Sequence, residues 1–310
     1  MKRVLLLLAA AGASLAGVMC TGEEPAEVPE TPNSDGGNRD GQTPDPDAGG
    51  AQPFPKTIPG LTLWLDGADG NSVKRKNAGS DETVTNWLDK SGESPPKNFV
   101  PVEGQPAPTF DYTAMNEGKM SALAFSQPVG QYLKGPSLAG LPAGEGFIVF
   151  HSKEINAPDG GPHLTYGLWQ FGSFHGAHPH FDNNVVESFG SGNQPIYSAG
   201  VDGAEVWKPQ IFSVIATLEG YSAFSNAVPL TGGDRYGHVL LFNPYGSLIG
   251  ANAAYQLDAA APPLTPTSYF NGFIAEVLIY DHRLPTAHHD AVQQYLSQKW
   301  NIPLRGDAGP

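Results

Sequence analysis

The segment that most constrains the fold of this chain lies near its end, between Tyr269 and Trp300. It begins with Asn271-Gly272, a pair of residues typical of turns. The run Phe273–Tyr280 that follows is apolar and rich in β-branched residues on both faces, apart from Glu276. This pattern predicts a strand that is covered on both sides. We expect Glu276 to be structural and to accept backbone, Arg or Tyr hydrogen bonds, because a buried carboxylate must be paired.

The residues after this strand predict a single helix. Pro285 stands where a helix can begin without losing a backbone hydrogen bond. One apolar stripe at helical spacing follows, made of Ala291, Val292, Tyr295, Leu296 and Trp300. A lone helix at the end of a β-patterned chain has to dock on the domain to bury such a stripe. We expect His288 and His289, in the first turns of the helix, to be solvated.

Composition favours a β-rich domain with many turns. The chain has 310 residues, of which 15% are charged, with 38 Gly and 29 Pro. Further predicted strands are Leu61–Asp66, Phe147–Phe150, Ile211–Leu218 and Val239–Phe242, separated by turn pairs that contain glycine. Many short strands with such punctuation are typical of a β-sandwich or jelly roll. No second linker interrupts residues 57–304, so we expect one domain there, followed by a tail at 305–310.

The order of several short motifs strengthens this interpretation. The motifs are Pro59–Asp66, Trp87–Gly92, Pro108–Phe110, Leu123–Phe125, Gln131–Leu133, Phe270–Gly272, Ile274–Val277, Tyr280-Asp281, Tyr295-Leu296 and Lys299-Trp300. In this order they resemble the concanavalin A-like, laminin-G-type jelly roll of bacterial surface proteins. The resemblance implies an all-β sandwich of two antiparallel sheets with a short C-terminal helix. It also implies a concave face and rim loops that commonly bind sugars, proteins or calcium, without fixing the function.

The N-terminus predicts export. Lys2 and Arg3 precede the apolar run Val4–Ala16, so residues 1–20 are predicted to be an export signal. The apolar run itself is too short for a comfortable membrane span. Cys20 is the only cysteine, so no disulfide can form within the chain. Its position resembles the acylated cysteine of a bacterial lipoprotein signal, and diacylation would provide stable anchoring. Met19 departs from that pattern, and simple secretion with cleavage after Ala16 is the alternative.

Residues 21–56 are predicted to be a disordered tether. They are rich in Pro, Gly and acidic side chains and have Phe54 as their only aromatic residue, so they cannot bury enough apolar surface to fold. The chain is therefore expected in the bacterial cell envelope as an anchored lipoprotein, or otherwise secreted. The formal net charge of −14 argues against nucleic acid as a partner and against polybasic attachment, so a membrane would be reached only through the lipid.

Motifs for catalysis are absent from the sequence. Glycoside hydrolases of the resembled fold carry Glu-x-Asp-x-x-Glu on one strand, and no such spacing occurs here. The sequence also has no Gly-x-Ser-x-Gly, no His-Glu-x-x-His and no phosphate-binding glycine loop. No catalytic residue is therefore assigned. A glycoside-active enzyme with an unconventional site would need two carboxylates about 5–10 Å apart lining a cleft.

Two segments are candidates for metal binding. The first holds His175, His178, His180 and Asp182, residue types that bind zinc, copper or nickel. Its alternative interpretation is a polar loop at the rim. The second holds Asp66, Asp69 and Asn71, whose oxygens suit calcium but are equally common in ordinary turns.

Exposed aromatic rings would stack on the faces of sugars. Trp169, Trp207, Tyr236 and Tyr245 lie in Gly-, Pro- and Asn-rich segments where loops are expected, whereas Trp64 and Trp87 are assigned a structural role. The resulting hypothesis is a non-catalytic binding module whose partner is a glycan or a cell-surface protein. The alternatives are the unconventional glycoside-active enzyme and a purely structural or adhesive surface protein.

Overall fold

The apolar segment before the helix forms β19 (Gly272–Tyr280), which lies inside a large antiparallel sheet. The computed structural model describes residues 54–78, 81–153, 166–173, 176–178, 184–187, 189–192, 195–198, 207–234, 239–253 and 265–305. All of them belong to one compact unit, 46–310. Every residue of β19 is buried, which confirms a strand covered on both faces. Gly272 opens the strand with φ of 145°, where a side chain would meet the backbone of His151.

The large sheet has ten strands among the described residues, in the order β14-β13-β12-β8-β19-β6-β5-β3-β2, with β1 also paired to β19. Their bounds are β1 (Leu61–Asp66), β2 (Val73–Ala78), β3 (Asp81–Trp87), β5 (Thr109–Met115), β6 (Met120–Phe125), β8 (Gly144–Ser152), β12 (Gln210–Ala216), β13 (Tyr221–Ser225) and β14 (Val228–Pro229). β6 pairs with the first part of β19 and β1 with the second part, so the first strand of the domain is hydrogen-bonded to the last.

Short strands form the opposite layer. They are β4 (Val100–Pro101), β7 (Leu133–Gly135), β9 (Trp169–Gln170) and β16 (Ser247–Ile249) in one sheet, β10 (Val185–Val186), β11 (Pro195–Ser198) and β15 (Thr231–Asp234) in a second, and β17 (Ala251–Ala253) with β18 (Pro266–Tyr269) in a third. A 3₁₀ turn, η1 (Gln127–Val129), precedes β7. The fold is therefore an all-β sandwich, with a second layer divided into three small sheets rather than built as one.

The main core fills the space between these layers. Its side chains include Ile148, Phe212 and Ile274 from the large sheet, together with Trp169 and Ile249 from the short strands. Because successive residues along a strand point to opposite faces, the neighbours of these residues in the large sheet point the other way. Phe147, Val149 and Leu278 form part of a second apolar cluster on that outer face.

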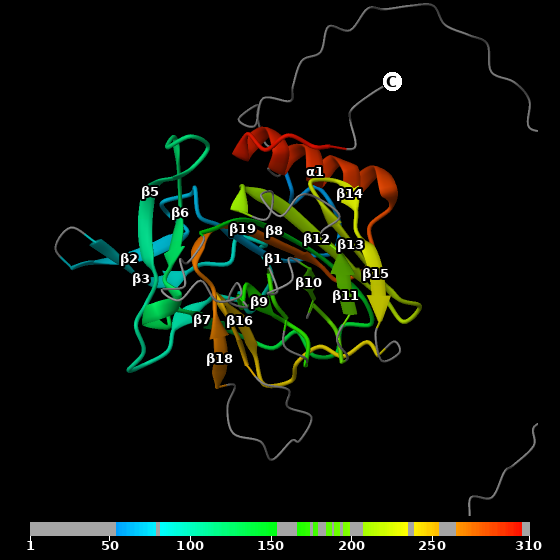
Figure 1. Cartoon of the computed structure of the whole chain (residues 1–310), viewed down its shortest axis with the longest axis horizontal. Coiled ribbons are helices and arrows are strands. Elements are labelled where there is room, and N and C mark those ends of the chain that lie inside the picture. The colour runs from blue at the N-terminus through cyan, green and yellow to red at the C-terminus, as the bar shows by residue number, and fades with distance from the viewer. Residues whose placement is uncertain are drawn as a thin grey trace, which may run out of the picture. The chain divides into compact units, whose positions relative to one another are not determined.

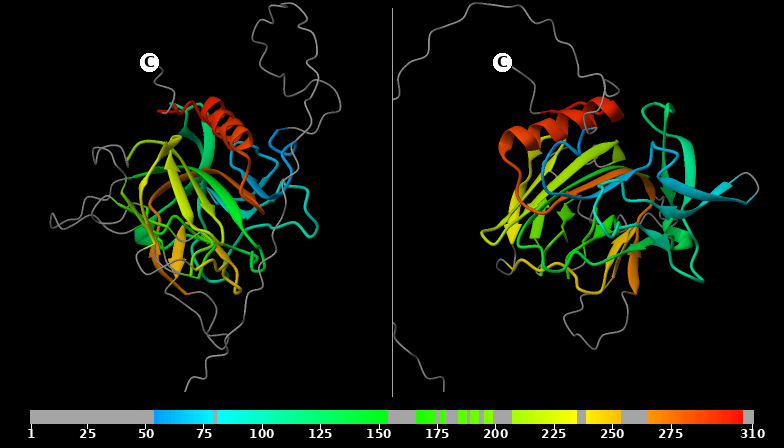
Figure 2. Two further views of the ribbon diagram at one scale, coloured as in Figure 1. Left: turned by 90° about the vertical axis from the view of Figure 1, so that its right-hand side faces the viewer. Right: turned by 180° about the vertical axis from the view of Figure 1, so that it is seen from behind.

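The helix α1 (Thr286–Trp300) covers the outer cluster. Val292, Leu296 and Trp300 are buried in it, which confirms that the predicted stripe docks on the sheet. Figures 1 and 2 show α1 on the side of the large sheet opposite to β9, β10 and β16. The sandwich is therefore three layers deep where the helix lies.

Three sequence expectations differ from the structure. Val239–Phe242 is not a continuous strand, because only isolated bridges from Leu240 and Phe242 occur there. His289 is not solvated but buried against the sheet, while His288 is exposed. The packed chain also begins before residue 57, since Phe54 contacts Tyr295 with ring centroids 5.0 Å apart.

Other expectations lie outside the described residues. These are the signal segment at 1–20 with Cys20, the tether up to residue 53, and the last part of the tail at 306–310. Within the described ranges, no helix has the length and apolarity needed to cross a membrane.

Candidate functional site

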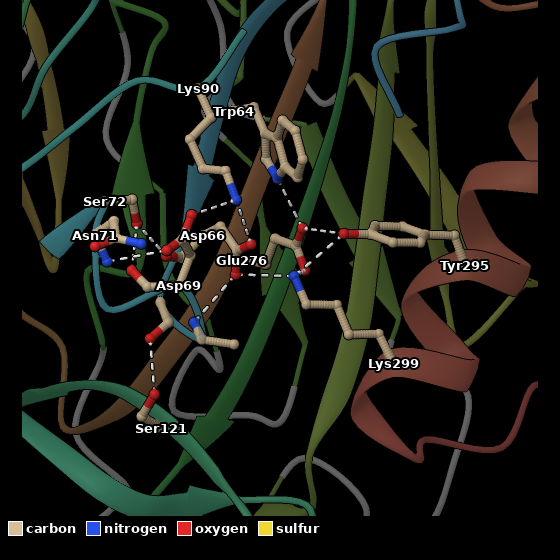
Figure 3. Close-up of polar contacts among 12 residues, drawn as sticks. Trp64, Asp66, Asp69, Asn71, Ser72, Lys90, Ser121, Glu276, Tyr295 and Lys299 are labelled. Atoms are coloured by element: carbon tan, nitrogen blue, oxygen red, sulfur yellow. Dashed lines mark hydrogen bonds and ion pairs between the residues drawn. The ribbon is translucent and has the colours of Figure 1, made fainter. Parts of the chain in front are cut away.

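A buried charge network joins the sheet to the helix. Asp66 at the end of β1 is the register partner of Glu276 on β19, so the two side chains share one face of the sheet. Lys299, in the last turn of α1, lies between them (Figure 3): its Nζ is 2.8 Å from Asp66 Oδ1 and 2.8 Å from Glu276 Oε2. A cation in the last turn also interacts favourably with the helix dipole.

A second lysine completes the ion pairs of Asp66. Lys90 Nζ is 2.9 Å from Asp66 Oδ2 and 2.8 Å from Asp69 Oδ2, and it lies 4.2 Å from the ring centroid of Trp64. Two backbone N–H groups fix the turn that carries Lys90 to β1. The backbone N–H of Lys90 donates to the Trp64 carbonyl oxygen, and the backbone N–H of Trp64 donates to Asp89 Oδ1. The Trp87–Gly92 motif thus places the ammonium group of Lys90 beside the end of β1.

Glu276 accepts hydrogen bonds from several side chains at once. Its Oε1 accepts from Trp64 Nε1 at 2.8 Å and from the Tyr295 hydroxyl at 2.9 Å, and its Oε2 accepts from Trp300 Nε1 at 2.6 Å. The expected paired, structural carboxylate is confirmed, with Tyr295 among its partners. The two indoles and Lys299 were not anticipated, because they lie far away in the sequence.

Burial and charge set different proton affinities for the two carboxyl groups. Burial raises the pKa of Glu276 above its ordinary value, against the opposing effect of Lys299. Burial would also raise the pKa of Asp66, but Lys299 and Lys90 outweigh it and hold that pKa below the ordinary value. Within the network, Glu276 is therefore the group that takes up a proton more readily.

This pair of carboxylates does not form an open hydrolytic cleft. Both are 2.8 Å from the same ammonium nitrogen, so those two oxygens lie no farther apart than twice that distance. The space between them is filled by Lys299, and the Glu276 side chain is fully buried under α1. A glycosidic bond has no place there, and the contacts instead hold the helix to the sheet.

The calcium candidates belong to the same network. The Asp69 Oδ1 accepts the backbone N–H of Asn71 at 2.9 Å, as in an ordinary Asx turn, and its other oxygen is paired with Lys90. A calcium ion at Asp66 and Asp69 would have to displace the Lys90 ammonium, so this donor set does not fit the ion as it stands. Across the described ranges, no group of three or more His, Cys, Asp and Glu side chains is arranged to hold a metal.

His178 is the one histidine of the histidine-rich segment that lies among the described residues. His178 is buried in the main core, with its Nε2 3.1 Å from Glu187 Oε2 and its ring centroid 4.8 Å from that of Phe212. Glu187 also accepts hydrogen bonds from Trp169 Nε1 and from a backbone N–H. His175, His180 and Asp182 lie outside the described residues, so a zinc site formed with them stays a prediction.

The four aromatic candidates are distributed over different environments. Trp169 lies on β9 and is fully buried, because its indole packs in the main core. Its indole N–H donates to Glu187. Trp207 and Tyr245 are half-buried, and Trp207 packs edge-on against Tyr166 at 5.9 Å. Tyr236 lies outside the described residues. Trp169 therefore offers no free ring face to a ligand.

An exposed aromatic cluster lies instead at the β2 end of the large sheet. Tyr112 on β5 is 56% exposed, more than any other aromatic side chain in the described parts of the chain. Its hydroxyl donates to Glu82 Oε2 and accepts from Arg75 Nη1, each at 2.7 Å, and its ring meets Phe110 edge-on at 5.0 Å. The guanidinium carbon of Arg75 lies 4.4 Å above the Phe110 ring.

The register places this cluster on the core-facing side of the sheet. Phe110 pairs with Glu82 on β3 and with Leu123 on β6, and Leu123 pairs with Ile274 in the main core. The cluster, which we call the Tyr112 face and define by Arg75, Glu82, Phe110 and Tyr112, thus continues the inner face beyond the area that the short strands cover. Figure 1 shows β2 and β3 extending at this end of the sheet.

The chemistry of the Tyr112 face combines an apolar ring with charged hydrogen-bonding groups. The hydrogen bond to Glu82, with a smaller effect of burial, raises the pKa of Tyr112, so its hydroxyl remains a donor at neutral pH. Tyr112 and Phe110 were not among the predicted site residues, because ligand-binding rings were expected in loops and these two lie on a strand. The alternation of Phe110 and Tyr112 along one strand was the available signal that both rings share a face.

Comparisons with known proteins give structural neighbours only. No family model and no curated protein matches the chain. A Trypanosoma rangeli sialidase in complex with 2,3-difluorosialic acid aligns with a TM-score of 0.47 and 14% identity, over 82% of this chain and 35% of that one. Domain 4 of an extracellular GH43 arabinanase from Geobacillus stearothermophilus, in complex with arabinotriose, aligns with a TM-score of 0.41 and 15% identity, over 76% and 98%. The binding domain of botulinum neurotoxin serotype D aligns with a TM-score of 0.43 and 11% identity, over 79% and 54%.

Proposed function

We propose that this β-sandwich is a non-catalytic binding module of the laminin-G type and that its ligand is a glycan held at the Tyr112 face. The observation that carries the proposal is the exposure of the Tyr112 ring between Arg75 and Glu82. An aromatic ring offers a flat apolar surface, and the C–H face of a sugar ring is its natural partner. The neighbouring charged groups can hydrogen-bond the hydroxyls at the edge of the same sugar.

The Tyr112 face is held in place before a ligand arrives. Hydrogen bonds at both Arg75 and Glu82 fix the Tyr112 hydroxyl, and Phe110 supports its ring from the side. A fixed aromatic side chain loses little conformational entropy on binding. Arg75 uses Nη1 for both of its hydrogen bonds in the cluster, and the remaining nitrogens of a guanidinium fork are donors suited to sugar hydroxyls.

A glycan-binding screen of the purified chain tests this function. Wild type is compared with Tyr112→Ala, and Leu218→Ala serves as the control because Leu218 is also exposed but lies at the β12–β13 turn. We expect Tyr112→Ala to bind about tenfold more weakly, since losing about 1.4 kcal/mol changes Kd tenfold. Unchanged binding by Tyr112→Ala would place the ligand elsewhere. No glycan binding by wild type, together with co-purification of another surface protein, would favour the structural or adhesive alternative.

We further propose that the protein is exported and anchored through acylated Cys20. The support is the order of Lys2 and Arg3, the apolar run Val4–Ala16, the cysteine and the polar tail. Metabolic labelling with a fatty acid is expected to mark wild type and not Cys20→Ala. A free N-terminus at Gly17 would instead establish cleavage after Ala16 and secretion.

A further inference from the structure

An amine, a carboxyl group and a second carboxyl group that can transfer protons lie together at the end of β1. Lys299 Nζ is 2.8 Å from Asp66 Oδ1, and the other oxygen of Asp66 is 2.9 Å from Lys90 Nζ. Glu276 Oε2 is 2.8 Å from the same Lys299 nitrogen. Figure 3 shows the amine, the carboxyl group and the second carboxyl group pointing toward one another from α1, β1 and β19.

We propose that Lys299 and Asp66 react to form a side-chain amide, with Glu276 transferring the protons and Lys90 stabilising the carboxyl oxygen that is retained. This cross-link is a modification of the chain by its own residues. It is independent of the ligand at the Tyr112 face, because no residue of the network belongs to that face.

The reaction is a condensation that needs no co-reactant. The Lys299 nitrogen attacks the Asp66 side-chain carbon, and a new C–N bond forms. The bond between that carbon and Oδ1 breaks. Starting from the ammonium and the carboxylate, the nitrogen gives up two protons, and both leave with Oδ1 as one water molecule.

Glu276 is placed to carry those protons. Attack requires a neutral amine, so the ammonium must first lose a proton to a nearby base. Because burial raises the pKa of Glu276, this carboxylate is the stronger base of the two that contact Lys299. The protonated Glu276 then acts as the acid that delivers the proton to the departing oxygen. The Tyr295 hydroxyl holds Glu276 Oε1 from the other side at 2.9 Å.

Lys90 stabilises the negative charge that develops during the reaction. Negative charge develops on the Asp66 oxygens as the tetrahedral intermediate forms, and a fixed cation at that position stabilises it without reorganisation. Lys90 is held there by Asp69 and by the Trp64 ring, so its ammonium is in place before the reaction begins.

The surroundings exclude water, which favours the amide. The side chain of Asp66 is 7% exposed and that of Lys299 is 17% exposed. The buried indoles of Trp64 and Trp300 both donate to Glu276, whose side chain is fully buried. Burial penalises the charged reactants far more than the neutral amide, and it keeps out the water that would reverse the reaction.

Peptide mapping of the purified full-length chain tests the cross-link. The protein is unfolded, digested with a protease that cuts after aromatic residues, and measured by mass spectrometry. We expect a linked pair of peptides, one with Asp66 and one with Lys299, whose mass is the sum of the two less one water. A digest that holds only the two free peptides would overturn the proposal without any variant.

Two variants and a control assign the roles. Lys299→Arg keeps the positive charge but lacks the amine, and Glu276→Gln lacks the proton carrier, so neither is expected to give the linked pair. Glu145→Gln is the matched control, because Glu145 is another fully buried carboxylate that contacts α1. It should retain the link. Circular dichroism verifies that each variant folds, and a full yield of linked peptides from Glu276→Gln would exclude Glu276 from the reaction.

Discussion

Glu145 on β8 and His289 on α1 form a buried pair in which Oε1 and Nδ1 are 2.5 Å apart. The other oxygen of Glu145 accepts the backbone N–H of Leu284, just before the helix, at 2.8 Å. Phe147 and Phe224 enclose the imidazole ring, with centroids 5.4 and 5.1 Å away. The start of the helix is therefore attached to the sheet, as is its end, where Lys299 contacts Asp66 and Glu276.

Replacing His289 tests that attachment. His289→Ala leaves the Glu145 carboxylate buried with a single backbone donor, and breaking such a pair costs about 3–5 kcal/mol. We expect the free energy of unfolding in urea to fall by that amount. The control is His288→Ala, an exposed neighbour on the same helix turn, which should change it by less than about 0.5 kcal/mol. Equal effects of both variants would show that the pair with Glu145 does not stabilise the helix.

The indole of Trp300 provides a second test, with Trp87 as a close match. Both side chains are almost completely buried. Trp300 Nε1 donates to Glu276, whereas the Trp87 indole N–H has no partner among the residues that the structure describes. Trp→Phe substitution removes a similar volume at each site. We expect Trp300→Phe to destabilise the protein by about 1.5–3 kcal/mol more than Trp87→Phe, because a hydrogen bond to a charged group is lost.

The unfolding midpoints of these two variants in urea measure this difference. A difference near zero would mean that Glu276 finds a replacement donor, such as water, once the Trp300 indole is gone.

The pairing of Asp69 with Lys90 predicts a dependence on acid. Burial would raise the pKa of Asp69, but hydrogen bonds from Lys90 and the Asn71 backbone outweigh it, so the pKa lies below its ordinary value of 3.8. A lowered pKa in the folded state contributes stability that is present above 3.8 and is lost as the pH falls through the lowered value. We expect wild type to lose stability more steeply than Asp69→Asn as the pH falls from 3.8 to the lowered value.

Thermal unfolding between neutral and acid pH measures this slope. Asp290→Asn is the control, since Asp290 is exposed on α1 and forms no ion pair with another of the described residues. If Asp69→Asn and wild type show the same slope, Lys90 does not hold Asp69 in the folded protein.

The hydroxyl and the ring of Tyr112 can be separated in binding. Tyr112→Phe keeps the ring on which a sugar would stack but removes the hydroxyl that joins Arg75 to Glu82. We expect glycan affinity to fall less than in Tyr112→Ala, with the free energy of unfolding changed by less than about 0.5 kcal/mol because the residue is exposed. Titration calorimetry with a glycan found in the screen provides the comparison. Equal losses in both variants would assign the binding to the hydroxyl rather than to the ring.

The local patterns of the sequence predicted much of the fold. The strand Gly272–Tyr280 and the helix Thr286–Trp300 follow from apolar runs and helical spacing, which are properties of neighbouring residues. The partners of their polar residues could not be predicted in the same way. Glu145 lies 144 positions from His289, and Trp64 lies 212 positions from Glu276, so only the folded chain brings them together.

Exposure was the second quantity that the sequence could not provide. Trp169 and Tyr112 are both aromatic residues on strands, yet one is fully buried and the other is more than half exposed. The difference depends on where the short strands of the second layer end, and nothing in the segments around these residues records that limit. Sites that rest on exposed rings therefore required the tertiary structure.

The pairing of β1 with β19 has a mechanical consequence. Because β1 runs antiparallel to β19, Leu61 lies beside Tyr280, and the chain enters β1 and leaves β19 at the same end of the strand pair. Tension between these two points therefore separates the strands from that end, one backbone hydrogen bond after another. The contacts of α1 with the sheet have to break before such a load reaches Tyr280, so the docked helix protects this strand pair against extension.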